Sequence, residues 1–461
     1  MLPFSPLLHD IHFATQLPVV QQRVYKIEIL RKPEKTVSYK FQLRKPTQRL
    51  CKLRQLTTMI KKIPARLTTS IAIIFFSIVL LPDSSNGQRT FVNNDEQPWM
   101  LYPFKKEEKL FPILKSDSTS FLCPIAKKEV KWQEQFVFNP AAIVRNGKVY
   151  LLFRGEDKIG KFGGTSRLGI AESSDGLHFT KYPMPILFPD NDANLEYENE
   201  GGCEDPRVVE SEDGTYFLTY TAFNGKLARL CVATSKDLFH WKKRGLAFGQ
   251  AKNGDYSKLW SKSGSIICRK VNEKFIATKI NGKYWMYWGE TDIFLATSDN
   301  LIDWEPVLKE EKTGKILSAY LGNGSYRLQF DEPKYYFKTA VAIREGRFDS
   351  ELVEPGPPAL ITKQGILFIY NASNSGSKGD KNLLSGEYTV GQVLFDIKDP
   401  SSIIGRCENY FLRAEQKNEI SGQMSNTAFV EAMVLFKGKW FVYYVMAEAG
   451  IGVAVCNKSL D

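Results

Sequence analysis

The chain has 461 residues, of which 43% are hydrophobic and 13% aromatic, so it can bury a large core and is too apolar for a disordered protein. Its net charge of +11 arises almost entirely from residues 1–87, where 14 Lys and Arg side chains accompany only 4 Asp and Glu. Residues 88–461 carry 48 basic and 47 acidic side chains, and this near neutrality argues against nucleic acid as a partner.

The only strongly apolar run lies at residues 67–81 and has the features of a secretory signal peptide. Lys61, Lys62 and Arg66 precede the run, and a small polar segment follows it. The run has 15 residues, fewer than the roughly 20 that a bilayer-spanning helix needs. We therefore predict a signal peptide over 59–87 that begins at Met59, and we interpret 1–58 as a basic extension that is not native to the protein.

This prediction places the mature protein outside the cytoplasm, in the periplasm or the extracellular space, with no stable membrane insertion after cleavage. The alternative is a membrane anchor with a basic cytoplasmic tail, which the positive-inside rule also allows. Cleavage would leave residues 88–461 as the folded domain, because every repeat described below lies within them.

Metal and cofactor sites are not expected. Six cysteines follow the leader without CxxC spacing, and we predict that they are buried as small hydrophobic residues. An exported location would permit disulfides, whose pairing the sequence does not define. Outside the leader only His178 and His240 are present, which argues against a His-rich zinc site and against a Ser-His-Asp triad.

A turn glycine followed by an aromatic-rich alternating strand occurs five times after the leader. The copies are NGKVYLLFRG, DGTYFLTYTA, NGKYWMYWGE, KQGILFIYNA and KGKWFVYYVM, with glycine spacings of 67, 68, 83 and 73 residues. A second strand follows each copy, in SRLGIAES, ARLCVATS, DIFLATS, TVGQVLFD and GIGVAVC. These five strand-rich repeats predict an all-β fold, a five-bladed β-propeller over residues 88–461 with a central active-site pocket.

Charged residues gather at the ends of the predicted strands, where a propeller would turn them toward its centre. Carboxylates at several blade openings favour general acid/base chemistry on a neutral polar substrate. Trp285, Trp288, Tyr220 and Tyr370 are candidates for an apolar platform on which sugars stack. The charged candidates are Arg154, Arg167, Glu204, Asp205, Arg207, Glu290, Asp292 and Glu354.

The motifs FNPAAIVRNGKVYLLFRG, SRLGIAESSDGLHF, EGGCEDPRVV, ARLCVATSKDLFHW, INGKYWMYW and EPGPPAL together resemble glycoside hydrolase family 130 from about Phe136 onward. The resemblance implies a five-bladed β-propeller that acts on β-mannosides, either as a phosphorylase producing mannose 1-phosphate or as a β-1,2-mannosidase. It also implies that Asp205, in the EDPR motif, is the general acid. The substrate-binding residues that it implies are Asn139, Arg154, Arg167, Glu204, Arg207, Tyr220, Arg229, Lys279, Asp292, Tyr370 and Asn371.

Comparison with the phosphorylase pattern favours water as the nucleophile. Where those relatives typically have a His-Arg pair, this chain has Gly289 and Glu290, and Asn371 stands where they tend to have a histidine. Glu354 occupies a position that is usually small. A carboxylate there would repel phosphate, whereas inverting hydrolysis needs a carboxylate base, so we predict an inverting hydrolase with Glu290 or Glu354 as the base.

Two other functions stay open at this point. In a phosphorylase, Arg229 and Lys279 would hold phosphate and the two glutamates would bind sugar. In a non-catalytic carbohydrate-binding propeller, the substrate would bind without product release. Export favours hydrolysis, because a sugar phosphate is useful only where it can be metabolised. The expected partner in all three cases is a mannose-containing oligosaccharide, and the oligomeric state is not defined.

Overall fold

The computed structural model describes residues 97–461 apart from 160–163, 312–333, 423, 448–449 and 461. The predicted extension over 1–58 and the predicted signal peptide over 59–87 therefore lie outside the described residues. All described residues belong to one compact unit, Asn94–Asp461. Within the described ranges, no helix combines the length and the apolar character needed to cross a membrane.

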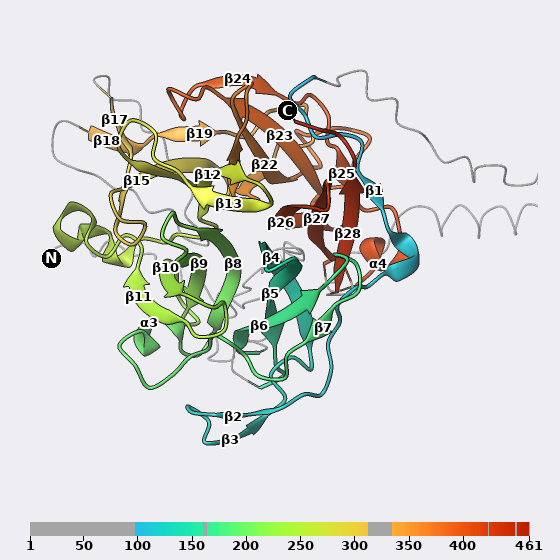
Figure 1. Ribbon diagram of the computed structural model, residues 1–461. Coiled ribbons are helices and arrows are strands. Elements are labelled where there is room, and N and C mark those ends of the chain that lie inside the picture. Colours follow the sequence, from blue (N-terminus) through green and yellow to red (C-terminus); the bar gives the residue numbers. More distant parts are fainter. Residues whose placement is uncertain (1–96, 160–163, 312–333, 423, 448–449, 461) are drawn as a thin grey trace, which may run out of the picture. The chain divides into compact units, whose positions relative to one another are not determined.

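The fold is built almost entirely from antiparallel β-strands, which confirms the prediction of an all-β protein. Five groups of consecutive strands follow one another around the described unit (Figure 1). The first group contains β4 (Phe136–Arg145), β5 (Lys148–Glu156), β6 (Ser166–Ser173) and β7 (Thr180–Lys181). The second contains β8 (Gly202–Glu210), β9 (Tyr216–Phe223), β10 (Ala228–Ser235) and β11 (Lys242–Leu246).

The third group contains β12 (Ser265–Val271), β13 (Lys274–Ala277), β14 (Tyr284–Trp288), β15 (Ile293–Ser298), β16 (Trp304–Pro306) and β19 (Thr339–Val341). The fourth contains β20 (Leu352–Pro355), β21 (Ala359–Ile361), β22 (Ile366–Ser373), β23 (Tyr388–Phe395), β24 (Ile403–Arg406) and β25 (Leu412–Arg413). The fifth contains β26 (Ala428–Phe436), β27 (Lys439–Met446), β28 (Ile451–Cys456) and β1 (Lys105–Lys106).

Short elements connect these groups. Two hairpins are formed by β2 (Phe121–Cys123) with β3 (Lys128–Val130) and by β17 (Leu308–Glu311) with β18 (Lys334–Phe337). The helical segments are η2 (Glu108–Leu110), α3 (Leu195–Glu198), η3 (Ala251–Lys258) and α4 (Lys417–Ile420).

The five predicted glycine-strand repeats are confirmed as β5, β9, β14, β22 and β27, and their predicted partners are β6, β10, β15, β23 and β28. Gly147 and Gly282 open two of these strands with φ of 70° and 82°. A Cβ atom at either position would meet no atom within 4 Å. The left-handed backbone of the turn, rather than lack of space, therefore favours glycine there.

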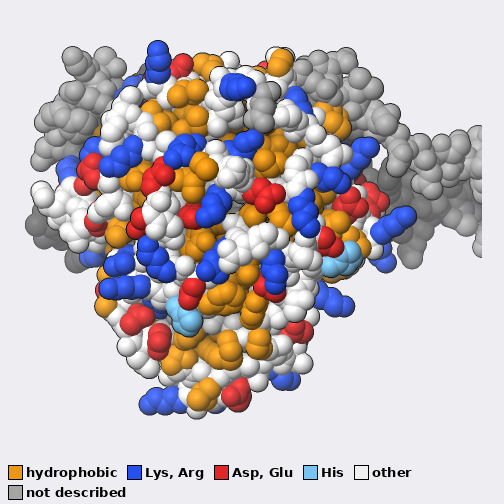
Figure 2. Space-filling view, in the orientation of Figure 1, with side chains coloured by type: hydrophobic (Ala, Val, Ile, Leu, Met, Phe, Trp, Pro, Cys, Tyr) orange, Lys and Arg blue, Asp and Glu red, His pale blue; other side chains and the backbone are white. Residues whose placement is uncertain are grey.

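The core lies between the strand groups and is rich in aromatic side chains. Tyr287 stacks against Phe368 and Phe395 with ring centroids 4.6 and 4.7 Å apart, which joins the third group to the fourth. The six cysteines of the described region are buried, as predicted, and none of them forms a disulfide within that region. On the face seen in Figure 2, acidic and basic side chains are interspersed, in keeping with the near-neutral charge of residues 88–461.

The fifth group is completed by a strand from the beginning of the described chain. Lys105 and Lys106 in β1 pair with Val455 and Ala454 in β28. At its other edge, β26 packs against β4, and β4 packs against β8. These three strands from the fifth, first and second groups therefore lie together, and they carry much of the candidate site.

Candidate active site

Three β-bulges bring polar residues together on adjacent strands. The strand register shifts between Phe138 and Ala141 in β4, between Glu204 and Arg207 in β8, and between Val430 and Ala432 in β26. A bulge releases its extra residue from regular pairing and redirects its side chain. Asn139 and Asp205 sit in two of these bulges with φ of 46° and 48°, a conformation that Asn and Asp tolerate better than most residues.

Arg154, on β5, binds the carboxylate of Asp205 and two carboxylates beside it. Its Nη1 donates to Asp205 Oδ1 at 3.1 Å, and its Nη2 donates to Glu204 Oε1 and to Glu156 Oε2, both at 3.0 Å. The Nε atom donates to Ser166 Oγ at 2.8 Å. One guanidinium thus fixes the orientation of the predicted acid and of both neighbouring carboxyl groups.

The two adjacent carboxyl groups of Glu204 and Asp205 differ in their affinity for a proton. Burial raises the pKa of Glu204 to about 7, and the negative charge of Asp205 adds to this effect. Burial alone would raise the pKa of Asp205, but Arg154 and Lys262 outweigh it and lower the pKa. Because interacting carboxyl groups titrate as a pair, the pair holds one proton below about pH 7 and loses it above that pH.

Lys262 lies between the predicted acid and one of the predicted bases. Its Nζ atom is 3.8 Å from Asp205 Oδ2 and 3.8 Å from Glu290 Oε2. The two carboxylate oxygens are therefore no farther apart than twice that distance. This upper limit overlaps only the lower part of the roughly 6.5–9.5 Å separation of carboxyl groups in inverting glycosidases.

Glu290 and Glu354 both lie near this lysine. Trp260 Nε1 donates to Glu290 Oε2 at 3.2 Å, and Ser263 Oγ donates to Glu354 Oε1. Burial raises the pKa of Glu354, the negative charge of Glu290 adds to the rise, and Lys262 opposes it. The two glutamates therefore interact electrostatically with each other, and both they and Asp205 interact with Lys262.

The structure thus brings together seven of the residues selected from sequence. They are Asn139, Arg154, Glu204, Asp205, Arg207, Glu290 and Glu354.

Other predicted site residues lie apart from the group around Lys262. Arg167 points to the opposite face of the sheet from Arg154, because the two occupy alternating positions in β5 and β6, and it binds Asp157 at 2.7 Å. Lys279 lies near the hairpin turn at the far end of β14 from Glu290, 5.0 Å from the Tyr284 ring.

Arg229 stacks on the Tyr197 ring at 4.5 Å and donates to the Glu196 carbonyl at 3.4 Å. Its cation is therefore engaged beside α3. Asp292 lies near Arg406 and accepts a hydrogen bond from the backbone of Ile343, so it belongs to a different charged cluster from Lys262.

The predicted aromatic platform is also corrected. Tyr220, Trp288 and Tyr370 are fully buried, and the two tyrosine hydroxyls donate to Glu198 and Asp349, both at 2.8 Å. Such side chains cannot stack on a sugar without unpacking the core.

Trp285 is half-buried and donates to the Ile280 carbonyl at 3.0 Å. Asn371 donates to the Val430 carbonyl at 2.8 Å and accepts from the Val430 N–H at 2.7 Å, which joins β22 to β26. Its role in the structure is to brace these two strands.

Sequence reasoning missed several residues of the site. Lys262, Trp260 and Ser263 come from the segment before β12, whose polar sequence WSKSGS was the available signal. For Glu431 the available signal was its position as the one charged residue of β26, AFVEAMVLF. Tyr388 lies close enough to Glu354 and Glu290 for burial and their charges to raise its pKa.

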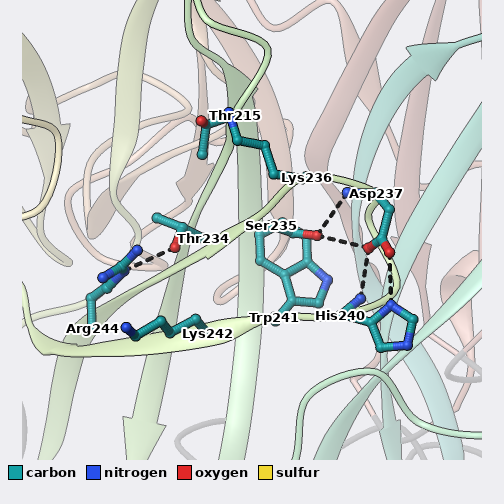
Figure 3. A pocket seen from close by; sticks show the side chains of 9 residues that line it. All are labelled: Thr215, Thr234, Ser235, Lys236, Asp237, His240, Trp241, Lys242 and Arg244. Carbon is teal, nitrogen blue, oxygen red and sulfur yellow. Dashed lines mark hydrogen bonds and ion pairs between the residues drawn. The ribbon is translucent and has the colours of Figure 1, made fainter.

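A separate hollow of about 490 Å³ lies beside β11 (Figure 3). Lys236, Lys242 and Arg244 make it basic, and Asp237 is the one carboxylate among its lining residues. That carboxylate is engaged by His240 Nδ1 at 2.7 Å and by backbone N–H groups. The hollow therefore lacks the opposed carboxylates of the Asp205 site, which we take as the candidate active site.

Comparison with known proteins gives a family match over most of the described chain. Residues 111–460 match the model of glycoside hydrolase family 130, described as beta-1,4-mannooligosaccharide phosphorylase. The 1,2-beta-oligomannan phosphorylase of Thermoanaerobacter sp. (strain X514) is 30% identical over 337 residues, which cover 71% of this chain and 92% of that protein.

Two solved structures are similar at higher identity. A glycosyl hydrolase from Bacteroides ovatus has 41% identity and a TM-score of 0.71, with 79% of this chain and 96% of that chain covered. The other comes from work on GH130 glycoside hydrolases that target beta-1,2 mannosidic linkages in Candida mannan. It has 39% identity and a TM-score of 0.71, with 80% of this chain and 99% of that chain covered.

Proposed function

The chain belongs to glycoside hydrolase family 130, and on that premise we propose that it is an inverting glycoside hydrolase that cleaves β-1,2-mannosides and releases mannose. The observation that carries the proposal is the pair of carboxylates, Glu290 and Glu354, near Lys262. A phosphate dianion in this part of the site would face both negative charges, whereas a water molecule would find two proton acceptors.

On the acid side, Asp205 donates a proton to the departing sugar oxygen. The resemblance implies that this proton passes through a hydroxyl of the bound mannose. Arg154 holds Asp205 and Glu204 together, so a proton bound by this pair below about pH 7 lies within the site. Asp205 is the donor, and Glu204 is the neighbour that keeps a proton within reach.

On the base side, Glu290 and Glu354 hold the attacking water and accept its proton. Glu290 is the more accessible of the two, with 24% of its side chain exposed, whereas Glu354 is buried. Attack from the side opposite the leaving group inverts the β-linkage, so the first product is α-mannose. We propose that the two glutamates share this task.

The proposed architecture is a five-bladed β-propeller whose blades are the five strand groups. Its support is that each group supplies the site: Arg154 comes from the first, Asp205 from the second, Glu354 from the fourth and Glu431 from the fifth. Glu290 lies two residues after the end of β14 in the third. Export from the cytoplasm is part of the proposal and is supported by the signal-like segment over 59–87.

Phosphorolysis is the second candidate, because the Thermoanaerobacter relative is a phosphorylase. The cations assigned to phosphate under this alternative do not support it, since Arg229 stacks on Tyr197 and Lys279 lies beside Tyr284. Arg154 and Lys262, which do lie in the site, each already face carboxylates.

Product analysis of the purified protein tests the proposal. With β-1,2-mannobiose we expect free mannose at equal rates with and without phosphate, and slower cleavage of β-1,4-mannobiose. Proton NMR of the early product should show the α-anomer. Phosphate-stimulated release of mannose 1-phosphate would instead establish the second candidate.

Replacing Lys262 should shift the pH dependence of cleavage. Its positive charge lowers the pKa of Asp205 and opposes the raised pKa of Glu354. In Lys262→Met both values should rise, so the base ionises and the acid deprotonates only at higher pH. We expect both limbs of the kcat/KM profile to move to higher pH, and Lys262→Arg to preserve the wild-type profile. An unshifted profile in Lys262→Met would contradict this account.

A further inference from the structure

Glu431 is a buried carboxyl group that the proposed mechanism does not use. It lies at the bulge of the otherwise apolar strand β26 and is fully buried. Its Oε1 atom accepts from Asn139 Nδ2 at 3.0 Å and lies 3.0 Å from Arg207 Nη2. Its Oε2 atom is buried and has no hydrogen-bond partner among the described residues. A side chain so enclosed cannot touch a sugar, so its effect must pass through its neighbours.

Arg207 connects Glu431 to both sides of the reaction. Its Nη1 donates to the Asp205 carbonyl at 3.0 Å, on the acid side. Its Nη2 and Nε donate to the carbonyls of Pro355 and Gly356 at 2.8 and 3.3 Å, directly after Glu354. A single planar guanidinium therefore ties the backbone of the acid to the backbone beside the base.

We propose that Glu431 is a positioning residue which, together with Asn139, holds Arg207 in the orientation that sets the spacing between Asp205 and Glu354. This inference rests on the proposed function, in which those two residues are acid and base. The separation of the two carboxyl groups must leave room for one water molecule, so a change in the orientation of Arg207 alters the geometry of attack.

The backbone that presents Glu431 is itself braced. Asn371 forms two hydrogen bonds with the backbone of Val430, the residue before Glu431. Because Asn371 lies opposite Glu354 in the pairing of β22 with β20, the same contact ties the base strand to β26. The carboxyl group is thus held on a rigid support, as a positioning role requires.

The protonation state of Glu431 follows from the groups that face it. These are Arg207 and Asp205 on β8, Glu354 on β20 and the neutral Asn139 on β4. Burial raises the pKa of Glu431 to about 8, with Asp205 and Glu354 adding to the rise and Arg207 opposing it. At neutral pH the group therefore holds a proton, and its Oε1 still accepts from Asn139 and lies 3.0 Å from Arg207 Nη2. Glutamine reproduces that acceptor, whereas leucine removes it.

Steady-state kinetics of Glu431→Leu and Glu431→Gln test the inference. We expect Glu431→Leu to lower kcat at least about 10-fold with KM within about 2-fold, since misplacement by 1 Å can cost roughly 10²-fold in rate. Glu431→Gln should keep kcat within about 3-fold at pH 7. Both proteins should lose activity as the Glu204–Asp205 pair gives up its proton, and above pH 8, where Glu431 ionises in the wild type, the wild type should lose more activity than Glu431→Gln. Product identity is measured on the wild type, so failure of the proposed function would be seen separately from failure of the inference.

Glu419→Leu is the matched control. Glu419 is also fully buried, it pairs with Lys106 at 2.8 Å and accepts from Tyr444, and its bonded partners lie outside the active site. Its loss should lower the melting temperature and leave kcat unchanged. Unchanged kcat in Glu431→Leu, or an equal loss of kcat in Glu419→Leu, would overturn the inference.

Thermal unfolding keeps the inference testable should Glu431→Leu fail to fold. The folded protein holds the Glu431 proton up to about pH 8, whereas the unfolded chain releases it near its ordinary value of about 4.3. The contribution of Glu431 to stability therefore falls as pH rises between these values. Relative to Glu431→Gln, the wild type should lose melting temperature from pH 6 to pH 9. A constant difference, together with the same alkaline decline of kcat in both proteins, would overturn the inference.

Discussion

Asp205→Asn should reduce cleavage of β-1,2-mannobiose by at least about 10²-fold, because an amide cannot donate the proton that the leaving oxygen needs. Asparagine suits this position structurally, since it tolerates the left-handed backbone, where φ is 48°. Its amide oxygen can still accept from Arg154 Nη1. The expected change is therefore in kcat, with an unchanged circular dichroism spectrum.

The leaving group provides the control for this prediction. The phenolate of an activated aryl β-mannoside leaves without full protonation. The loss of activity in Asp205→Asn should therefore be much smaller on that substrate. Near-normal turnover of the natural disaccharide would remove Asp205 from the role of acid. An equal loss on both substrates would point instead to damage to the substrate-binding geometry.

The double variant Glu290→Gln/Glu354→Gln should lose hydrolysis by at least about 10²-fold, because the attacking water then has no proton acceptor. Each single variant should retain part of the activity, since both glutamates interact with one another and with Lys262. Removing two negative charges beside that cation also creates room for an anion. Azide should therefore restore turnover of an activated mannoside and yield an α-mannosyl azide, which NMR can identify.

Glu156→Gln is the control for charge removal in general. Glu156 binds Arg154 on the acid side at 3.0 Å, and its contacts include neither Lys262 nor the two proposed bases. Azide should therefore give no rescue in this variant. A β-mannosyl azide from the double variant would contradict single inversion, and absence of any rescue would assign the two glutamates to sugar binding.

The sequence was most informative where a local rule sufficed. The five aromatic strands and their partners were predicted, because alternation and turn glycines are properties of neighbouring residues. Asp205 was selected through the EDPR motif, and Glu290 and Glu354 were selected because each stands near a strand end. Arg167 lies on the opposite face of the sheet from Arg154, because a shift of one position in a strand moves a side chain to the other face.

The remaining site residues depend on long-range packing that a linear pattern does not contain. Glu431 reaches Asn139 across 292 residues, and Arg207 reaches Pro355 across 148. Lys262 belongs to an irregular segment without a repeating signal, and its position follows from the bond between its carbonyl and the Gly289 N–H. Tyr220 and Tyr370 were selected as sugar-stacking candidates because they lie near charged motifs, but both side chains are fully buried in the core.

The pairing of β1 with β28 has a consequence for the order in which the chain can fold. The segment around Lys105 is synthesised early, but its partner strand around Val455 is synthesised more than three hundred residues later. Hairpins such as β5 with β6 can form as soon as they emerge, whereas the fifth strand group must wait for both ends of the domain. Such distant pairing is associated with slow folding, and it exposes strand edges in the meantime. We therefore expect closure of the fifth group to be the last and slowest step of folding, and the one that most needs protection from aggregation.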